Sequence, residues 1–159
     1  MGDRHMKFRR VAVAWPAFLL LLGCQDADSR IAVDSMTVYS LDGTYHRQKG
    51  QKPPAETFHG YPVLGKVDIA AKDRTAILAA VKKGIAQSDG KENNCFWPRH
   101  GLRLKQEGKT IEYLICFECL QLEEFIDGGQ AHKPTTRSPA PVLDAQLERA
   151  GVPLQTGQE

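Results

Sequence analysis

The second half of the chain holds three cysteines, and His100 lies near them in the sequence; cysteine and histidine are both residue types that bind metal ions. Cys116 and Cys119 have the C-x2-C spacing of a zinc knuckle, and Cys95 and His100 add a third sulfur and an imidazole. Two residues three apart on a regular strand point to opposite faces, so the two motif sulfurs converge only if the strand bends. One hypothesis is a zinc-binding domain that uses Cys95, His100, Cys116 and Cys119.

A β-hairpin would bring these residues together. Glu107-Gly108 lies between two strand-like segments and predicts a tight turn. If the chain folds back there, Cys95 lies opposite residues 119–122 and His100 lies opposite residues 114–117, because the turn fixes the register. We therefore expect three sulfurs and one imidazole in one neighbourhood.

A disulfide is the chemistry that we favour for these sulfurs. The preferred pairing joins Cys95 to Cys119 or Cys116. Such a bond closes a loop of roughly twenty residues and would contribute about 3 kcal/mol to the stability of the fold. On that hypothesis one of the three sulfurs stays unpaired and the domain needs no cofactor. Zinc is the alternative, and three reduced buried thiols are a further one.

The segment 95–101, CFWPRHG, concentrates a thiol, two aromatic rings, a cation and an imidazole in one loop. Loops that a sheet positions often carry binding residues. We therefore expect Trp97, Arg99 and His100 to contribute to a binding site for an anion or a metal. The alternative is a structural loop in which Phe96 and Trp97 are core residues and Arg99 pairs with a glutamate of the following strand.

The segment also resembles, together with the later CFEC motif, a pattern of small uncharacterised bacterial envelope proteins over residues 93–122. That resemblance implies no activity for any residue. A thiol-dependent enzyme would need Cys95 as nucleophile and His100 as base, and no orienting third group can be named. No hydrolase or metalloprotease motif is present either. We favour a non-catalytic binding or structural module over an enzyme.

The N-terminal residues indicate export. Basic residues precede an apolar run, residues 11–23, that is too short to cross a bilayer and is typical of a secretory signal. Leu21-Leu22-Gly23-Cys24 resembles the lipobox of bacterial lipoproteins, a resemblance that covers residues 6–25. It implies cleavage before Cys24, which would then carry diacylglycerol and usually a further acyl chain such as palmitate. Several acyl chains make a stable membrane anchor.

The resemblance also implies a location. Gln25 follows the cysteine where an aspartate would favour the inner membrane, so we expect the periplasmic face of the outer membrane in a Gram-negative cell. The expected partners are the membrane, through the lipid, and another envelope component. The formal charge of +2 depends on the export signal, because residues 1–23 hold four basic residues and one acidic residue. The remaining chain is nearly neutral, so we expect no nucleic-acid partner.

Apolar periodicity predicts the elements that position these residues. We expect an α+β fold, in which a small antiparallel β-sheet is covered by one main helix and a short C-terminal helix is added. The expected organisation is a signal peptide at 1–23, a tether at 24–35, an α+β domain at 36–127, a linker at 128–141 and a helix at 142–151. Within the domain we expect strands at 36–40, 58–70, 102–105 and 110–126 and a helix at 73–89.

Three local expectations can be tested directly. The helix should begin near Asp73 and bury Ile77, Val81 and Ile85. An edge strand or a β-bulge is expected near Pro62 and Gly65. The Asp42-Gly43 turn predicts a hairpin in which residues 45–47 pair with residues 36–40.

Overall fold

The computed structural model describes residues 32–45, 52 and 54–155, so Cys24 and the expected signal peptide lie outside the described residues. The described chain is mostly sheet: seven antiparallel strands in the order β2-β3-β1-β4-β5-β6-β7. The expectation of a small sheet covered by one main helix is therefore wrong. The elements are β1 (Ser35–Leu41), β2 (Thr57–Phe58), β3 (Tyr61–Asp68), α1 (Ala71–Ala86), β4 (His100–Gln106), β5 (Lys109–Cys116), β6 (Gln121–Ile126), β7 (Gly129–Pro134) and α2 (Ala140–Arg149).

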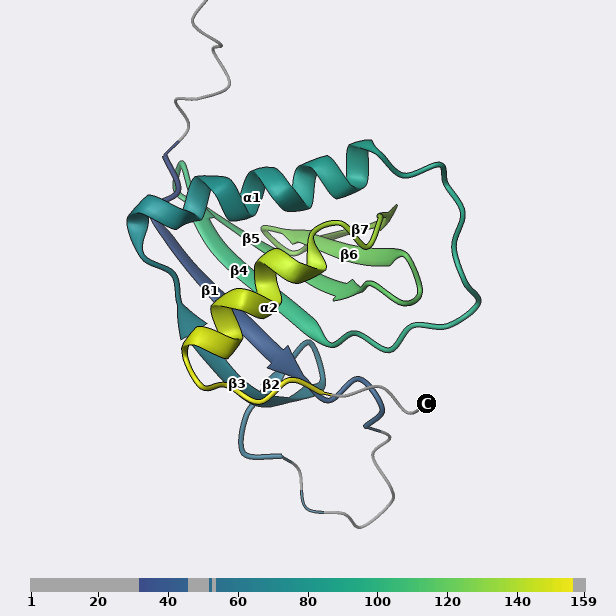
Figure 1. The fold of residues 1–159 in the computed structure, drawn as a ribbon, viewed down its shortest axis with the longest axis horizontal. Coiled ribbons are helices and arrows are strands. Elements are labelled where there is room, and N and C mark those ends of the chain that lie inside the picture. Colours follow the sequence, from purple (N-terminus) through teal and green to yellow (C-terminus); the bar gives the residue numbers. More distant parts are fainter. Residues whose placement is uncertain (1–31, 46–51, 53, 156–159) are drawn as a thin grey trace, which may run out of the picture.

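Both helices pack on the same side of the sheet (Figure 1). The buried face of α1 contains Ile77, Leu78 and Val81, as its periodicity predicts, and Ile85 packs beside them. The helix begins two residues before Asp73, which lies in its first turn and is not its cap. In the described residues, no helix is long and apolar enough to cross a membrane.

The C-terminal helix docks on its own sheet, as a ten-residue helix must if it is to be stable. Leu143 and Leu147 of α2 are fully buried against β1 and its neighbours. Gly151 ends the helix with a positive φ of 66°, and the Val152 amide donates to the Leu147 carbonyl at 2.9 Å. These are the features of a glycine-terminated helix, which confirms the predicted end.

Three of the expected elements differ from the structure. The single strand expected at 110–126 is two strands, because the chain reverses between β5 and β6. The segment expected to be a linker, 128–141, contains the edge strand β7. The hairpin of 45–47 with 36–40 is wrong, because both sides of β1 are occupied by β3 and β4. The predicted bulge is confirmed, since Leu64 is the extra residue of β3 opposite β1.

The sheet curls into half of a barrel, away from the helices. His59, just after β2, stacks on Phe125 of β6 with ring centroids 3.8 Å apart, although these strands lie near opposite ends of the sheet order. The same imidazole is 2.9 Å from Glu112 of β5. A second, smaller core fills this concave side, where Phe58 stacks on Tyr39 at 4.6 Å. The molecule therefore has one core under the helices and another inside the curl.

Candidate functional site

The β4–β5 hairpin positions His100 as the sequence predicts. Glu107 and Gly108 form its two-residue turn with positive φ values of 52° and 76°, which suits a right-twisted hairpin. In the resulting register His100 is opposite Ile115, inside the expected range. Both sides of β5 are paired, which explains why the strand is apolar on both faces.

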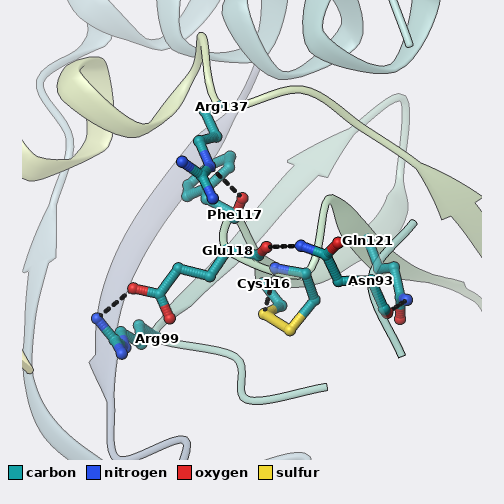
Figure 2. The surroundings of a disulfide bond; sticks show 8 residues. Asn93, Arg99, Cys116, Phe117, Glu118, Gln121 and Arg137 are labelled. Atoms are coloured by element: carbon teal, nitrogen blue, oxygen red, sulfur yellow. Dashed lines mark hydrogen bonds and ion pairs between the residues drawn. A yellow bond between two sulfur atoms is a disulfide. The ribbon is translucent and has the colours of Figure 1, made fainter. Parts of the chain in front are cut away.

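A tight turn after β5 gathers the sulfurs. Cys116 and Cys119 are joined by a disulfide across this turn, and the amide of Cys119 also donates to the Cys116 sulfur at 3.1 Å (Figure 2). Leu120 has a positive φ of 59°, which helps the chain to reverse into β6. The bend that the two motif sulfurs need is therefore present, and it is a complete strand reversal.

The Cys95 sulfur lies close to these two sulfurs, because hydrogen bonds hold its loop against the turn. The side chain of Asn93 donates to the Glu118 carbonyl at 2.7 Å (Figure 2). The backbone N–H of Asn93 donates to the Cys119 carbonyl at 2.9 Å. The three sulfurs lie within 4.8 Å of one another. The favoured disulfide joined Cys95 to Cys119 or Cys116, whereas the structure bonds Cys116 to Cys119 and leaves Cys95 as a half-buried free thiol.

His100 is not part of this sulfur group. Its Nε2 lies 2.7 Å from Asp144 Oδ1 on α2, and its ring packs against Phe117 with centroids 5.2 Å apart. In the part of the chain that the structure describes, the donors that lie close enough to share a metal ion are the three sulfurs alone. The expected set of four ligands is therefore brought together only in part.

A cavity of about 530 Å³ opens between α2, the loop before β4 and the turn after β5. This volume is in the range of small-molecule sites. All three residues that the sequence singled out for binding line it, namely Trp97, Arg99 and His100. The remaining lining residues are Phe117, Glu118, Arg137, Ala140, Asp144, Leu154 and Gln155. We call this cavity the α2 pocket.

Arg99 both lines the α2 pocket and pairs with a carboxylate. Its Nη1 lies 2.7 Å from Glu118 Oε1, so the cation does pair with a glutamate, and that glutamate lies in the turn after β5 (Figure 2). Its Nε is buried and has no hydrogen-bond partner among the described residues, and the same is true of Nδ1 of His100. Buried polar atoms are normally satisfied, so these two atoms are exceptions, and both belong to residues that line the pocket. Trp97 is not a core residue, since it is 49% exposed.

Sequence reasoning missed Arg137 and Asp144. Arg137 follows β7 in the segment expected to be a linker, and its Nε donates to the Phe117 carbonyl at 3.4 Å. Asp144 lies on the predicted C-terminal helix, but nothing in the sequence shows where such a helix docks. The one available signal was that Asp144 follows the apolar Leu143 and so lies at the edge of the buried face.

Comparisons with protein-family models, with curated proteins and with solved structures gave no match to this chain.

Proposed function

We propose that the chain is a lipid-anchored protein of the bacterial cell envelope whose domain is a non-catalytic binding module, and that the α2 pocket is its binding site. The anchor is supported by the lipobox-like residues that end at Cys24. The binding role is supported by one observation above all. Trp97, Arg99 and His100, the three residues that the sequence singled out, all line one pocket of small-molecule size.

Binding has more support than thiol catalysis in this region. A Cys95 nucleophile would need a base near its sulfur, but His100 is held by Asp144 and is not among the donor groups that surround the sulfur. Apolar walls with a few polar groups that point to one place are typical of ligand sites.

The anchor is tested with a single substitution. Wild-type protein produced in a bacterium should incorporate labelled palmitate and sediment with membranes, whereas Cys24→Ala should do neither, because the acceptor sulfur is missing. Cys95→Ser is the matched control and should keep the label. Lipid labelling that survives Cys24→Ala would contradict the proposal.

The pocket is tested by filling it. Ala140 lines the pocket on the first turn of α2, so Ala140→Trp should abolish small-molecule binding detected by ligand-observed NMR. Ala145→Trp on the exposed side of the same helix is the control, and it should bind as the wild type does. Equal binding by both folded variants would show that the α2 pocket is not the site.

A zinc-binding domain is the second candidate, because three sulfurs lie within 4.8 Å of one another. The reduced sulfurs would supply three of the four ligands that zinc takes, and His100 would not be the fourth. Thiols of the purified protein should be counted with and without a chelator. Stoichiometric zinc and three chelator-released thiols from Cys95, Cys116 and Cys119 would support this candidate, and His100→Ala should then leave the zinc content unchanged. One free thiol without metal supports the binding module.

A further inference from the structure

We infer that the ligand of the α2 pocket is a small amphiphilic anion, with an oxyanion such as a carboxylate attached to an apolar body. The inference rests on the proposed binding function and names its ligand class.

The unused hydrogen-bonding capacity of the pocket is mostly that of donors. Nε of Arg99 is buried without a partner among the described residues. Arg137 has no carboxylate within ion-pair distance in the described chain, and its one hydrogen bond there is the long one to the Phe117 carbonyl. A guanidinium donates five hydrogens and accepts none, and it binds carboxylates particularly well. A ligand that uses these two side chains must therefore present acceptor atoms.

The acidic groups of the pocket are already engaged. Glu118 holds Arg99 at 2.7 Å, and Asp144 holds Nε2 of His100 at 2.7 Å. Each carboxylate therefore already faces one partner, whereas Arg137 has no carboxylate within ion-pair distance in the described chain, so the unpaired charge of the pocket favours an anion. The start of α2 lies at Ala140 in the pocket wall, and a helix N-terminus carries partial positive charge that also favours an anion.

The walls require an apolar body next to the anion. Trp97, Phe117 and Leu154 contribute apolar surface to the pocket. Trp97 is 49% exposed, so a ligand that packs against its ring would bury apolar surface that now faces solvent. An inorganic anion would accept hydrogen bonds from the donors but would leave the apolar surface of the pocket exposed to water.

The experiment compares three molecules that differ only in their head group. The lipid-anchored chain that begins at Cys24 is used in non-ionic detergent, and Trp97 is its one tryptophan and reports on the pocket. 4-Phenylbutyrate, 4-phenylbutanol and 4-phenylbutylamine are titrated by calorimetry and by Trp97 fluorescence. We expect the carboxylate to bind about tenfold more tightly than the other two, since a charged hydrogen bond is worth that much. Added salt should weaken the carboxylate selectively.

A charge-removing variant tests the residue assignment. Arg137→Gln should weaken 4-phenylbutyrate about tenfold and leave 4-phenylbutanol unchanged, because only the anion uses the guanidinium. Arg149→Gln, an exposed arginine in the last turn of α2, is the control and should change neither. Since Arg137 is exposed, its substitution should not impair folding.

The outcomes separate the ligand class from the binding function. Tighter binding of the amine or the alcohol, with a Trp97 response that Ala140→Trp removes, would overturn the anionic ligand and leave the pocket as a binding site. No binding by any of the three would overturn the anionic ligand. If the pocket-filling variant also changed nothing in a broad screen, the binding function itself would fail.

Discussion

His132 is the residue whose protonation most directly affects the edge of the sheet. On β7 its ring lies between Glu123 and Glu92, with a nitrogen 2.9 Å from a carboxylate oxygen on each side. The hydrogen bond to Glu123, and then that to Glu92, raises the pKa of His132 above its ordinary value of 6.5. The protonated ring is therefore favoured in the folded state.

The stability that His132 contributes should depend on pH. A raised folded-state pKa gives a contribution that is complete below the unfolded value and is lost as the pH rises through the folded value. The free energy of unfolding of wild type minus that of His132→Gln should therefore be positive, about 0.2–1 kcal/mol for such an exposed network, at pH 5.5 and near zero at pH 9. Urea denaturation at both values measures it. A difference that grows with pH would contradict the assignment.

Gly101 is required by the packing of the concave core. A Cβ atom at this position would lie 2.8 Å from Phe58 Cδ1, closer than side chains approach one another. Gly101→Ala should therefore displace Phe58 from its stack on Tyr39 and cost about 1–3 kcal/mol of unfolding free energy. Gly129→Ala is the control, because its nearest atom would be the Ile126 carbonyl oxygen at 3.4 Å. Equal losses in the two variants would rule out the steric explanation.

At the scale of elements, sequence patterns predicted the hairpin turn and the buried face of α1, which local interactions determine. The Glu107-Gly108 turn fixed the hairpin register and hence the position of His100, and the spacing of Ile77 and Val81 identified the buried face of α1. The reversal between β5 and β6 was not predicted, because the Cys116–Cys119 segment contains no glycine or proline to signal a turn. The turn is instead stabilised by the Cys116–Cys119 disulfide and by a hydrogen bond from Asn93 of a loop distant in the sequence.

The strand β7 was missed for a related reason. Residues 129–134, GQAHKP, have no apolar alternation because β7 is an exposed edge strand. Its pairing with β6 and the ion pairs of His132 and Lys133 hold it in place. Of the candidate site, the members on or beside the hairpin were predictable, whereas Arg137 and Asp144 depend on how the chain returns after β7.

The disulfide turn should affect binding more than folding. A bond between residues only three apart restricts the unfolded chain little, about 2 kcal/mol by the loop-length relation. Phe117 and Glu118 lie inside this small ring and both line the α2 pocket. Replacing Cys116 and Cys119 with serine should therefore lower the unfolding free energy by about 2 kcal/mol or less, and should weaken 4-phenylbutyrate several-fold. Cys95→Ser is the control for loss of a sulfur alone. Unchanged affinity in the double variant would refute the coupling.

At the scale of the whole molecule, the two cores should unfold together because they share the central strands. β1 contributes Met36 and Val38 to the core under the helices and Tyr39 and Leu41 to the core inside the curl. A break in one core therefore disturbs the strands that support the other.

A substitution in the concave core tests this coupling. Phe58→Ala should cost about 3–5 kcal/mol and should shift the Trp97 fluorescence transition and the far-ultraviolet circular dichroism transition equally. Trp97 reports from the helix side of the sheet, so equal shifts mean that both cores unfold in one step. Leu64→Ala, at an exposed position of β3, should shift neither. Two separate transitions would contradict a single cooperative unit.

The course of β1 separates the point where the described chain begins from the α2 pocket. The described chain enters this strand near Asp34, whose carbonyl accepts from Arg74 at 2.5 Å, and it leaves beside His100 and the α2 pocket. Seven residues of strand span about 20 Å. If a lipid is attached upstream at Cys24, as we propose, the anchor would join the domain at one end of β1, while the α2 pocket lies beside the other end. Shortening the tether by residues 28–31 should then leave ligand affinity in vesicles unchanged, and a loss would show that the pocket faces the lipid.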